Sequence, residues 1–382
     1  MRNGKISDVC ANVYSGGTPN KKHDEYYAGG NIPWLNTSEI KFNRIYATEK
    51  FITDEGYSAS SAKWVPANAI IVAMYGATAA RVAISKIPLT TNQACCNLII
   101  DASKADYRYV YYWLCSRYTQ LAALANGGAQ QNLNAGQIKD FPIALPHIDV
   151  QRKIADLLST FDDKIEVNNE INENLQEQAQ ALYANMFIHN ASDQWAEGVL
   201  SDVADIAMGQ SPKGDTYNED GVGTVFFQGR GEFGFRFPTR RLFTTDPKRM
   251  AQSNDVLMSV RAPVGDLNVA YEPCCIGRGL GAIRSKDNHQ SFVLYTVFSL
   301  REKLDMFNGE GTVFGSINRD ALNSMPIIIP TKDELERFEE IVAPMDAAIR
   351  NNYEEICRLE AIRDSLLPRL MSGEIDVSNI QL

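Results

Sequence analysis

The chain has no long hydrophobic run and no recognisable signature of catalysis or metal binding. No apolar stretch among its 382 residues approaches the roughly 18 residues that a membrane-spanning helix needs, and the N-terminus shows no signal-peptide pattern. Its four histidines are scattered, and its seven cysteines are too few and odd in number for a disulfide framework. These absences predict a cytoplasmic protein that uses no membrane, keeps its cysteines reduced and holds no metal.

Segments that resemble nucleotide or zinc motifs fail on spacing. Residues 209–216 (GQSPKGDT) superficially resemble a phosphate-binding loop, but Lys213 precedes the second glycine and Asp215 stands where the lysine is needed. Two adjacent cysteine pairs lack the two-residue gap of common zinc sites and are predicted to be buried strand residues: Cys95 with Cys96, and Cys274 with Cys275. We therefore predict no catalytic residue in this chain.

What the sequence does contain is a long internal repeat. Residues 127–142 (GGAQQNLNAGQIKDFP) and 311–326 (GTVFGSINRDALNSMP) align at a shift of 184, and residues 6–9 (ISDV) recur as 200–203 (LSDV). The shift is larger near the start of the chain, so the second copy has net deletions, which belong in surface loops. A repeat of this length predicts two similar domains rather than an array of short units.

Within each copy the pattern mixes strands and helices. Short apolar runs rich in β-branched residues predict strands, and longer periodic segments predict helices. A proline-bounded apolar run near the end of each copy predicts a closing strand. The expected elements are strands at residues 69–74, 97–100, 141–146, 255–260 and 325–330, and helices at residues 107–125 and 291–307.

Each copy ends in a long segment with the seam of a coiled coil, in which apolar residues step alternately by about three and four. Each helix would run roughly 40 residues and so about 60 Å. Such a stripe cannot stay exposed to water, and its obvious partner is the other copy. The seam residues are Leu158, Phe161, Ile165, Asn168, Leu175 and Leu182 in the first copy and Val342, Met345, Ile349, Asn352, Ile356, Leu359 and Leu366 in the second.

Asn168 and Asn352 occupy the same place in the two aligned seams. A buried asparagine in a coiled coil usually fixes register or partner orientation at some cost in stability; the alternative is that both asparagines are solvated. Because a compact domain lies between the two helices, an antiparallel pair would place the domains at opposite ends of a rod. The predicted fold class is therefore α+β, with two similar mixed globular domains separated by two long antiparallel helices in a pseudo-twofold repeat.

The expected boundaries place globular domains at residues 1–146 and 189–330, the first long helix at 147–188, and the second long helix with a C-terminal tail at 331–382. Most of the charge lies in the helices: residues 147–188 carry −5 and residues 331–371 carry −4 of the total −10. The rest of the chain is close to neutral. Its domains can therefore present a basic face to phosphates although the whole chain is acidic.

Polar loops between the predicted elements hold the residue types that contact DNA. Asn and Gln pair with adenine, Arg pairs with guanine, and Lys and hydroxyls suit phosphates; ordinary turn and surface positions are the competing interpretation. The first copy offers Ser15, Thr18, Lys21, Lys22, Asn36, Ser38, Tyr75, Thr78, Arg81, Asn92, Gln93, Gln130 and Gln131. The second copy is richer in arginine, which favours guanine, and offers Gln210, Ser211, Lys213, Gln228, Arg230, Arg236, Arg240, Arg261 and Arg278.

These features together resemble the specificity subunit of type I restriction-modification systems. Each copy opens near a Gly-x-[Ser/Thr]-Pro turn, at residues 16–19 (GGTP) and 209–212 (GQSP), and ends in a proline-bounded strand and a long helix. Residues 145–154 (LPHIDVQRKI) are similar to the start of that family's first spacer helix. The resemblance covers essentially the whole chain.

The resemblance implies a non-catalytic subunit that reads a bipartite DNA sequence, one half per domain, with the helical pair setting the unspecified gap. It implies assembly with two methyltransferase subunits and, optionally, with restriction subunits. S-adenosylmethionine and ATP with magnesium would then belong to those partners, with no cofactor on this chain. Two alternative hypotheses are a duplicated scaffold that holds protein partners without touching DNA, and an enzyme with an unrecognised site.

Overall fold

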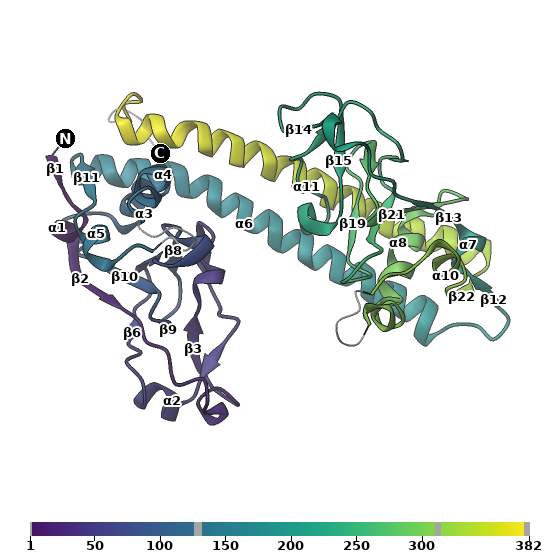
Figure 1. The fold of residues 1–382 in the computed structure, drawn as a ribbon, viewed down its shortest axis with the longest axis horizontal. Coiled ribbons are helices and arrows are strands. Elements are labelled where there is room, and N and C mark those ends of the chain that lie inside the picture. Colours follow the sequence, from purple (N-terminus) through teal and green to yellow (C-terminus); the bar gives the residue numbers. More distant parts are fainter. Residues whose placement is uncertain (1, 126–131, 310–314, 378–382) are drawn as a thin grey trace. The chain divides into compact units, whose positions relative to one another are not determined.

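The computed structural model describes residues 2–125, 132–309 and 315–377. The chain divides into two units: unit 1 joins the residues up to 165 with those from 357 onward, and unit 2 holds residues 166–356. Both units mix helices and strands, so the predicted α+β class is confirmed. Two long helices, α6 (Ile148–Ala184) and α11 (Lys332–Ser372), each run unbroken (Figure 1) and each contribute to both units.

The described residues of unit 1 form three sheets. The largest has the strand order β2-β10-β7-β8-β4, the second has the order β5-β3-β9-β6, and β1 pairs with β11. Its strands are β1 (Arg2–Lys5), β2 (Cys10–Ser15), β3 (Ile32–Leu35), β4 (Asn43–Ile45), β5 (Phe51–Ile52), β6 (Trp64–Val65), β7 (Ile70–Ala73), β8 (Val82–Ser85), β9 (Leu89–Thr91), β10 (Cys95–Ile100) and β11 (Pro142–Leu145). Its short helices are α1 (Ile6–Val9), α2 (Asp54–Ser58), α3 (Tyr107–Ser116), α4 (Tyr118–Ala122) and α5 (Ala135–Lys139).

The part of unit 2 that the structure describes also forms three sheets, in the orders β13-β21-β18-β19, β14-β16-β15-β20-β17 and β12-β22. Its strands are β12 (Ala196–Val199), β13 (Ala204–Met208), β14 (Tyr217–Asn218), β15 (Thr224–Phe227), β16 (Phe243–Thr244), β17 (Met250–Ala251), β18 (Val256–Ser259), β19 (Leu267–Val269), β20 (Cys274–Ile276), β21 (Leu280–Ser285) and β22 (Pro326–Ile329). Its short helices are α7 (Leu200–Val203), α8 (Gln290–Ser299), α9 (Arg301–Asp305) and α10 (Arg319–Asn323), and a π-helical turn at Asn185–His189 follows α6.

The sheets correspond one to one, which confirms the duplication. The order β2-β10-β7-β8 recurs as β13-β21-β18-β19, β5-β3-β9-β6 recurs as β16-β15-β20-β17, and β1-β11 recurs as β12-β22. The strands predicted from the sequence at 69–74, 97–100, 141–146, 255–260 and 325–330 are β7, β10, β11, β18 and β22.

The two predicted mid-domain helices are each broken once, which the sequence did not indicate. The break separates α3 from α4 at Arg117 and α8 from α9 at Leu300. At both breaks the backbone amide is shared between two carbonyls; that of Leu300, for example, lies 3.2 Å from the carbonyls of both Thr296 and Val297. This is the shared bonding of a tightened helical turn.

The cysteines and the helices carry two further observations. All seven cysteines are free, and the pairs in β10 and β20 are fully buried, as the sequence predicted: Cys95, Cys96, Cys274 and Cys275. Among the helices that the structure describes, none combines the length and the apolar character needed to cross a membrane.

The core of unit 1 contains residues from both long helices. Leu98 of β10 and Tyr109 of α3 belong to one buried cluster with Leu158 of α6 and Leu370 of α11. Leu158 lies near the start of its helix and Leu370 near the end of its own. The two helices therefore run antiparallel within this unit.

The core of unit 2 is built in the same way from the opposite ends of the helices. Phe292 of α8 shares a buried cluster with Ala179, near the end of α6, and with Val342, near the start of α11. None of the predicted seam residues is fully exposed. The antiparallel pairing expected from the sequence is thus present within each unit.

Buried asparagines lie between the helices in unit 2, but the aligned pair does not bond to itself. The Nδ2 of Asn352 donates to Oδ1 of Asn172 at 2.9 Å, and the Nδ2 of Asn168 donates to Oε2 of Glu355 at 2.8 Å. Asn168 and Asn172 are almost fully buried. In an antiparallel helix pair, two residues that are equivalent in the internal repeat face each other only at the midpoint of the pair. Asn168 and Asn352 are equivalent in the repeat but are offset from this point, so each contacts a residue about one helical turn away from the other.

An aspartate at equivalent positions of the two long helices anchors a polar network in each unit. Asp346 of α11 accepts hydrogen bonds from Arg236 Nη1 at 3.1 Å, from the Tyr295 hydroxyl at 2.9 Å and from the Ser291 hydroxyl at 2.7 Å. Arg236 is only 5% exposed. Asp346 is therefore the carboxylate that balances a buried guanidinium.

The aligned residue of α6, Asp162, has the same role in unit 1 with different partners. It accepts from the Tyr112 hydroxyl at 2.5 Å and from Arg363 Nη1 at 2.8 Å. In both units a helix seam is thus fixed to the globular part by a charge-assisted hydrogen bond, which is stronger than a neutral one.

We expect Asp346→Ala to destabilise unit 2 by about 3–5 kcal/mol, because Arg236 would keep a buried charge without its partner. The measurement is urea unfolding followed by circular dichroism and tryptophan fluorescence. Asp364→Ala is the control, since Asp364 lies on the same helix with its side chain 63% exposed and pairs only at the surface; its cost should stay below about 1 kcal/mol. Equal midpoints for the two variants would contradict this role of Asp346.

Candidate nucleic-acid interface

Four loops of unit 1 converge beside the ends of its central strands, at residues 16–19, 36–39, 75–78 and 92–94. Backbone hydrogen bonds tie them together: the amide of Gly17 donates to the Thr91 carbonyl at 2.9 Å, that of Asn92 to Leu35 at 3.0 Å, and that of Met74 to Ala94 at 2.8 Å. We call these four loops the loop cluster of unit 1.

Unit 2 has the same loop cluster, at residues 209–212, 228–232, 261–265 and 277–279. The amide of Gln210 donates to the Ile276 carbonyl at 2.9 Å, that of Gly277 to Phe227 at 2.8 Å, and that of Val260 to Gly279 at 2.9 Å. Each of these bonds has its counterpart in unit 1 at the aligned residues. The backbone of the cluster is therefore the same in both copies, and any difference between the two clusters lies in their side chains.

The first loop needs a glycine where it crosses the fourth. A Cβ at Gly16 would lie 2.1 Å from the Thr91 carbonyl oxygen, and one at Gly209 would lie 2.1 Å from that of Gly277. Both distances are far below contact, and both obstacles are backbone atoms. The Gly-x-[Ser/Thr]-Pro pattern seen in the sequence thus has a packing cause: it allows the first loop to lie directly on the fourth.

In unit 1 the cluster gathers seven of the predicted DNA-contacting residues, all uncharged: Thr18, Asn36, Ser38, Tyr75, Thr78, Asn92 and Gln93. The backbone amide of Gln93 lies 3.5 Å from the Thr18 hydroxyl, and the Asn92 side chain donates to the Asn36 side chain at 3.3 Å. Gln93 and Tyr75 are exposed, and the Tyr75 side chain projects with 44% of its surface free. Amides, hydroxyls and a phenol therefore form one polar surface.

The predicted residues of unit 1 differ in exposure, and those that are not in the four loops lie beside them or outside the described residues. Ser15 is half-buried at the end of β2, and Arg81 is half-buried just before β8. The Thr78 hydroxyl lies 3.5 Å from the carbonyl of Tyr75 in its own loop. Lys21 and Lys22 are exposed beyond the first loop, and Ser38 is exposed within the second loop. Gln130 and Gln131 fall outside the residues that the structure describes.

In unit 2 the same surface is rich in guanidinium and amide groups. The backbone amide of Arg278 donates to the Ser211 hydroxyl at 3.2 Å, which repeats the Gln93–Thr18 contact. The side chains of Gln210, Gln228, Arg261 and Arg278 are exposed, and Lys213 is exposed just beyond the first loop. Within the described parts of the chain, neither Arg261 nor Arg278 forms an ion pair.

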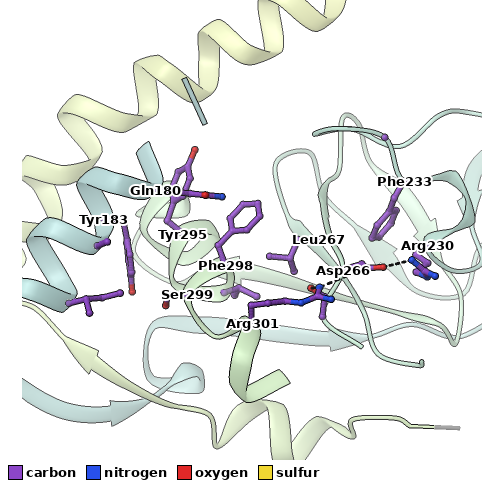
Figure 2. Close-up of a pocket in the computed structure, with 15 residues that line it drawn as sticks. Gln180, Tyr183, Arg230, Phe233, Asp266, Leu267, Tyr295, Phe298, Ser299 and Arg301 are labelled. Carbon is purple, nitrogen blue, oxygen red and sulfur yellow. Dashed lines mark hydrogen bonds and ion pairs between the residues drawn. The ribbon is translucent and has the colours of Figure 1, made fainter. Parts of the chain in front are cut away.

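Arg230 belongs to the second loop, but a carboxylate holds its side chain. Asp266 accepts from Arg230 Nη1 at 2.5 Å and from Arg301 Nη1 at 2.9 Å, at the side of a cavity of about 620 Å³ (Figure 2). The hydrogen bond to Asp266 also raises the pKa of Arg301. Asp266 thus lies between two guanidiniums and neutralises part of their charge.

A carboxylate also holds the side chain of Arg240. Arg236 is buried and does not reach the interface. The Arg240 Nε lies 2.5 Å from Glu272 Oε1, and its guanidinium stacks over the Tyr271 ring at 5.6 Å. Arg236 is buried and bonded to Asp346, so its prediction as a DNA contact was wrong. The sequence showed an arginine in a polar segment but could not show that its partner lies 110 residues away on α11.

Ser316 borders the interface of unit 2 and is not among the residues predicted from the sequence. Arg261 forms an isolated β-bridge with it, and Tyr75 of unit 1 forms one with Asn132, which directly follows the two predicted glutamines. Asn132 and Ser316 are aligned in the internal repeat, and this alignment was the signal that could have identified Ser316. Among the described residues, no three His, Cys, Asp or Glu side chains lie together as a metal site requires.

Comparison with known proteins agrees with this duplicated architecture. The sequence profile described as "Type I restriction modification DNA specificity domain" matches residues 1–177 and again residues 192–361. The type I restriction enzyme MjaIX specificity subunit of Methanocaldococcus jannaschii is 26% identical over an alignment of 411 positions, gaps included, that covers 98% of this chain and 94% of that protein. The putative MjaX specificity subunit of the same organism is 32% identical over 268 residues, 65% of this chain and 62% of that protein.

Among solved structures, the type I restriction-modification S subunit from M. genitalium matches with a TM-score of 0.59 at 18% identity, covering 97% of this chain and 95% of that one. At this identity the likeness supports the fold alone. The double match to the profile covers most of the sequence, each copy once. The chain therefore belongs to the family of type I restriction-modification DNA specificity subunits.

Proposed function

We propose that this chain is the DNA-reading subunit of a type I restriction-modification complex, in which each unit recognises one half of a split sequence through its loop cluster. The observation that carries the proposal is that one backbone frame is built twice with different polar side chains on it. Such a frame suits direct readout, in which side chains on a fixed support reach base edges. A scaffold for protein partners is not favoured, because the matching profile is that of a DNA specificity domain.

The proposal gives the chain itself no catalytic step. Methylation would be performed by methyltransferase subunits that carry S-adenosylmethionine, and cleavage by restriction subunits that use ATP and magnesium. This chain would contribute the sequence information and the placement of those partners on DNA. The acidic long helices support this division of surface, because phosphates repel them and leave them open to proteins.

The proposal also assigns the unspecified gap of the DNA target to the two long helices. An α-helix rises 1.5 Å per residue, so the 37 residues of α6 span about 55 Å. The partly buried hydrogen bonds of Asn168 and Asn352 fix the register of the pair in unit 2. A pair of helices locked in this way would resist a change in the distance between half-sites.

We expect the full chain to select a split sequence from randomised duplex DNA and to bind it in a salt-dependent way. For about six phosphate contacts, affinity should fall roughly 10³-fold between 50 and 200 mM salt. Binding releases counterions from the DNA, and this release favours binding less when the salt concentration is high. Fluorescence anisotropy on the selected duplex measures this. Binding that selects no sequence and ignores salt would contradict the proposal.

Insertion of one base pair in the gap should lower the affinity at least about 10-fold. It moves one half-site by about 3.4 Å and rotates it by about 35°, and a rigid pair of helices cannot follow. The matched control is a duplex in which the gap bases are exchanged at constant length, whose affinity should stay unchanged. If the lengthened duplex binds as well as the control, the helices do not set the gap.

A further inference from the structure

Gln93 and Arg278 occupy the same position on the fourth loop of their clusters. In each unit this residue is exposed and its backbone amide points to the hydroxyl of the first loop, Thr18 in unit 1 and Ser211 in unit 2. At this position the side chain is therefore a carboxamide in unit 1 and a guanidinium in unit 2.

The support beneath this position is the same in both units. Two residues beyond it, the amide of Cys95 donates to the Asn92 carbonyl at 3.2 Å, and the amide of Leu280 donates to that of Gly277 at 2.9 Å. Each turn is thus closed by its own hydrogen bond around the central residue. Because the backbones match, the two side chains leave the surface from equivalent points.

The side chain of Arg278 is exposed and is not held by any carboxylate among the described residues. Gly277 and Gly279 flank it, and a Cβ on either would come within 2.8 Å of the backbone of Gln228. The second loop therefore packs close against these glycines while Arg278 projects between them. By contrast, Asp266 and Glu272 hold the guanidiniums of Arg230 and Arg240.

We propose that this position is the equivalent base-reading position of the two units, where Gln93 contacts adenine in the first half-site and Arg278 contacts guanine in the second. The inference rests on the proposed function. A glutamine side chain donates to N7 and accepts from N6 of adenine, whereas a guanidinium donates to both O6 and N7 of guanine, so each side chain fits one purine. The exchange of one residue for the other would then exchange the base.

The test is a reciprocal exchange in the full chain, Arg278→Gln and Gln93→Arg, with selection from randomised duplexes followed by sequencing. Arg278→Gln should replace guanine by adenine, or remove the preference, at one position of the second half-site and leave the first half-site unchanged. Gln93→Arg should turn one adenine of the first half-site into guanine. Each change should shift the base preference by at least about 10-fold.

Controls make the same substitutions elsewhere in the same unit. Arg337→Gln alters an exposed residue of α11 in unit 2, and Gln120→Arg alters an exposed residue of α4 in unit 1; neither should change the selected sequence. Circular dichroism and thermal melting of each variant confirm that it folds as the unmodified chain does. Because the two exchanges lie in different units, failure of one variant to fold leaves the other as an independent test.

The results of these selections distinguish a failure of this inference from a failure of the proposed function. If the unmodified chain selects a split sequence but both exchanges leave it unaltered, the inference is overturned and the proposed function stands. A loss of affinity that is equal for all sequences would place Arg278 on a phosphate and also overturn it. If the unmodified chain selects no sequence at all, the proposed function itself fails.

Discussion

The burial of one apolar seam inside two separate cores is the constraint on which the rest of this protein depends. Each unit takes the start of one long helix and the end of the other, so neither core is complete without both. Leu158 and Leu370 are fully buried in unit 1, as are Ala179 and Val342 in unit 2. Burial of apolar surface is the main driving force of folding. Both units therefore need α6 and α11 to be intact in order to fold.

Polar groups then give the seam its register. An apolar seam alone tolerates sliding by a turn, whereas a buried amide or carboxylate must find its partner or bear the cost of desolvation. Asn172 with Asn352, and Asp346 with Arg236, meet this requirement at defined positions along the helices. The same logic explains why Arg236 is internal although its neighbours Arg240 and Arg241 form ion pairs at the surface.

The loop clusters show how duplication separates structure from recognition. Backbone bonds such as Asn92 to Leu35 and Gly277 to Phe227 are kept, while the exposed side chains at the aligned positions change from amide and phenol to guanidinium. A backbone frame depends on glycines and on main-chain groups, so substitutions at its exposed positions cost little stability. Under the proposed function, two units with the same backbone frame can therefore carry different half-site preferences without a change of fold.

The sequence by itself determined the duplication, the α+β class, five of the strands and the seams of both long helices, because periodicity and repeated turns are local properties of the chain. It also indicated most of the loop residues, since the glycines and hydroxyls that build the loops recur in both copies. Only the tertiary structure decided which of these residues share a surface, which arginines are held by carboxylates such as Asp266 and Asp346, and which asparagines meet across the helices. Those outcomes depend on pairings between residues far apart in the chain, and no local pattern encodes the partner of a charged or polar group.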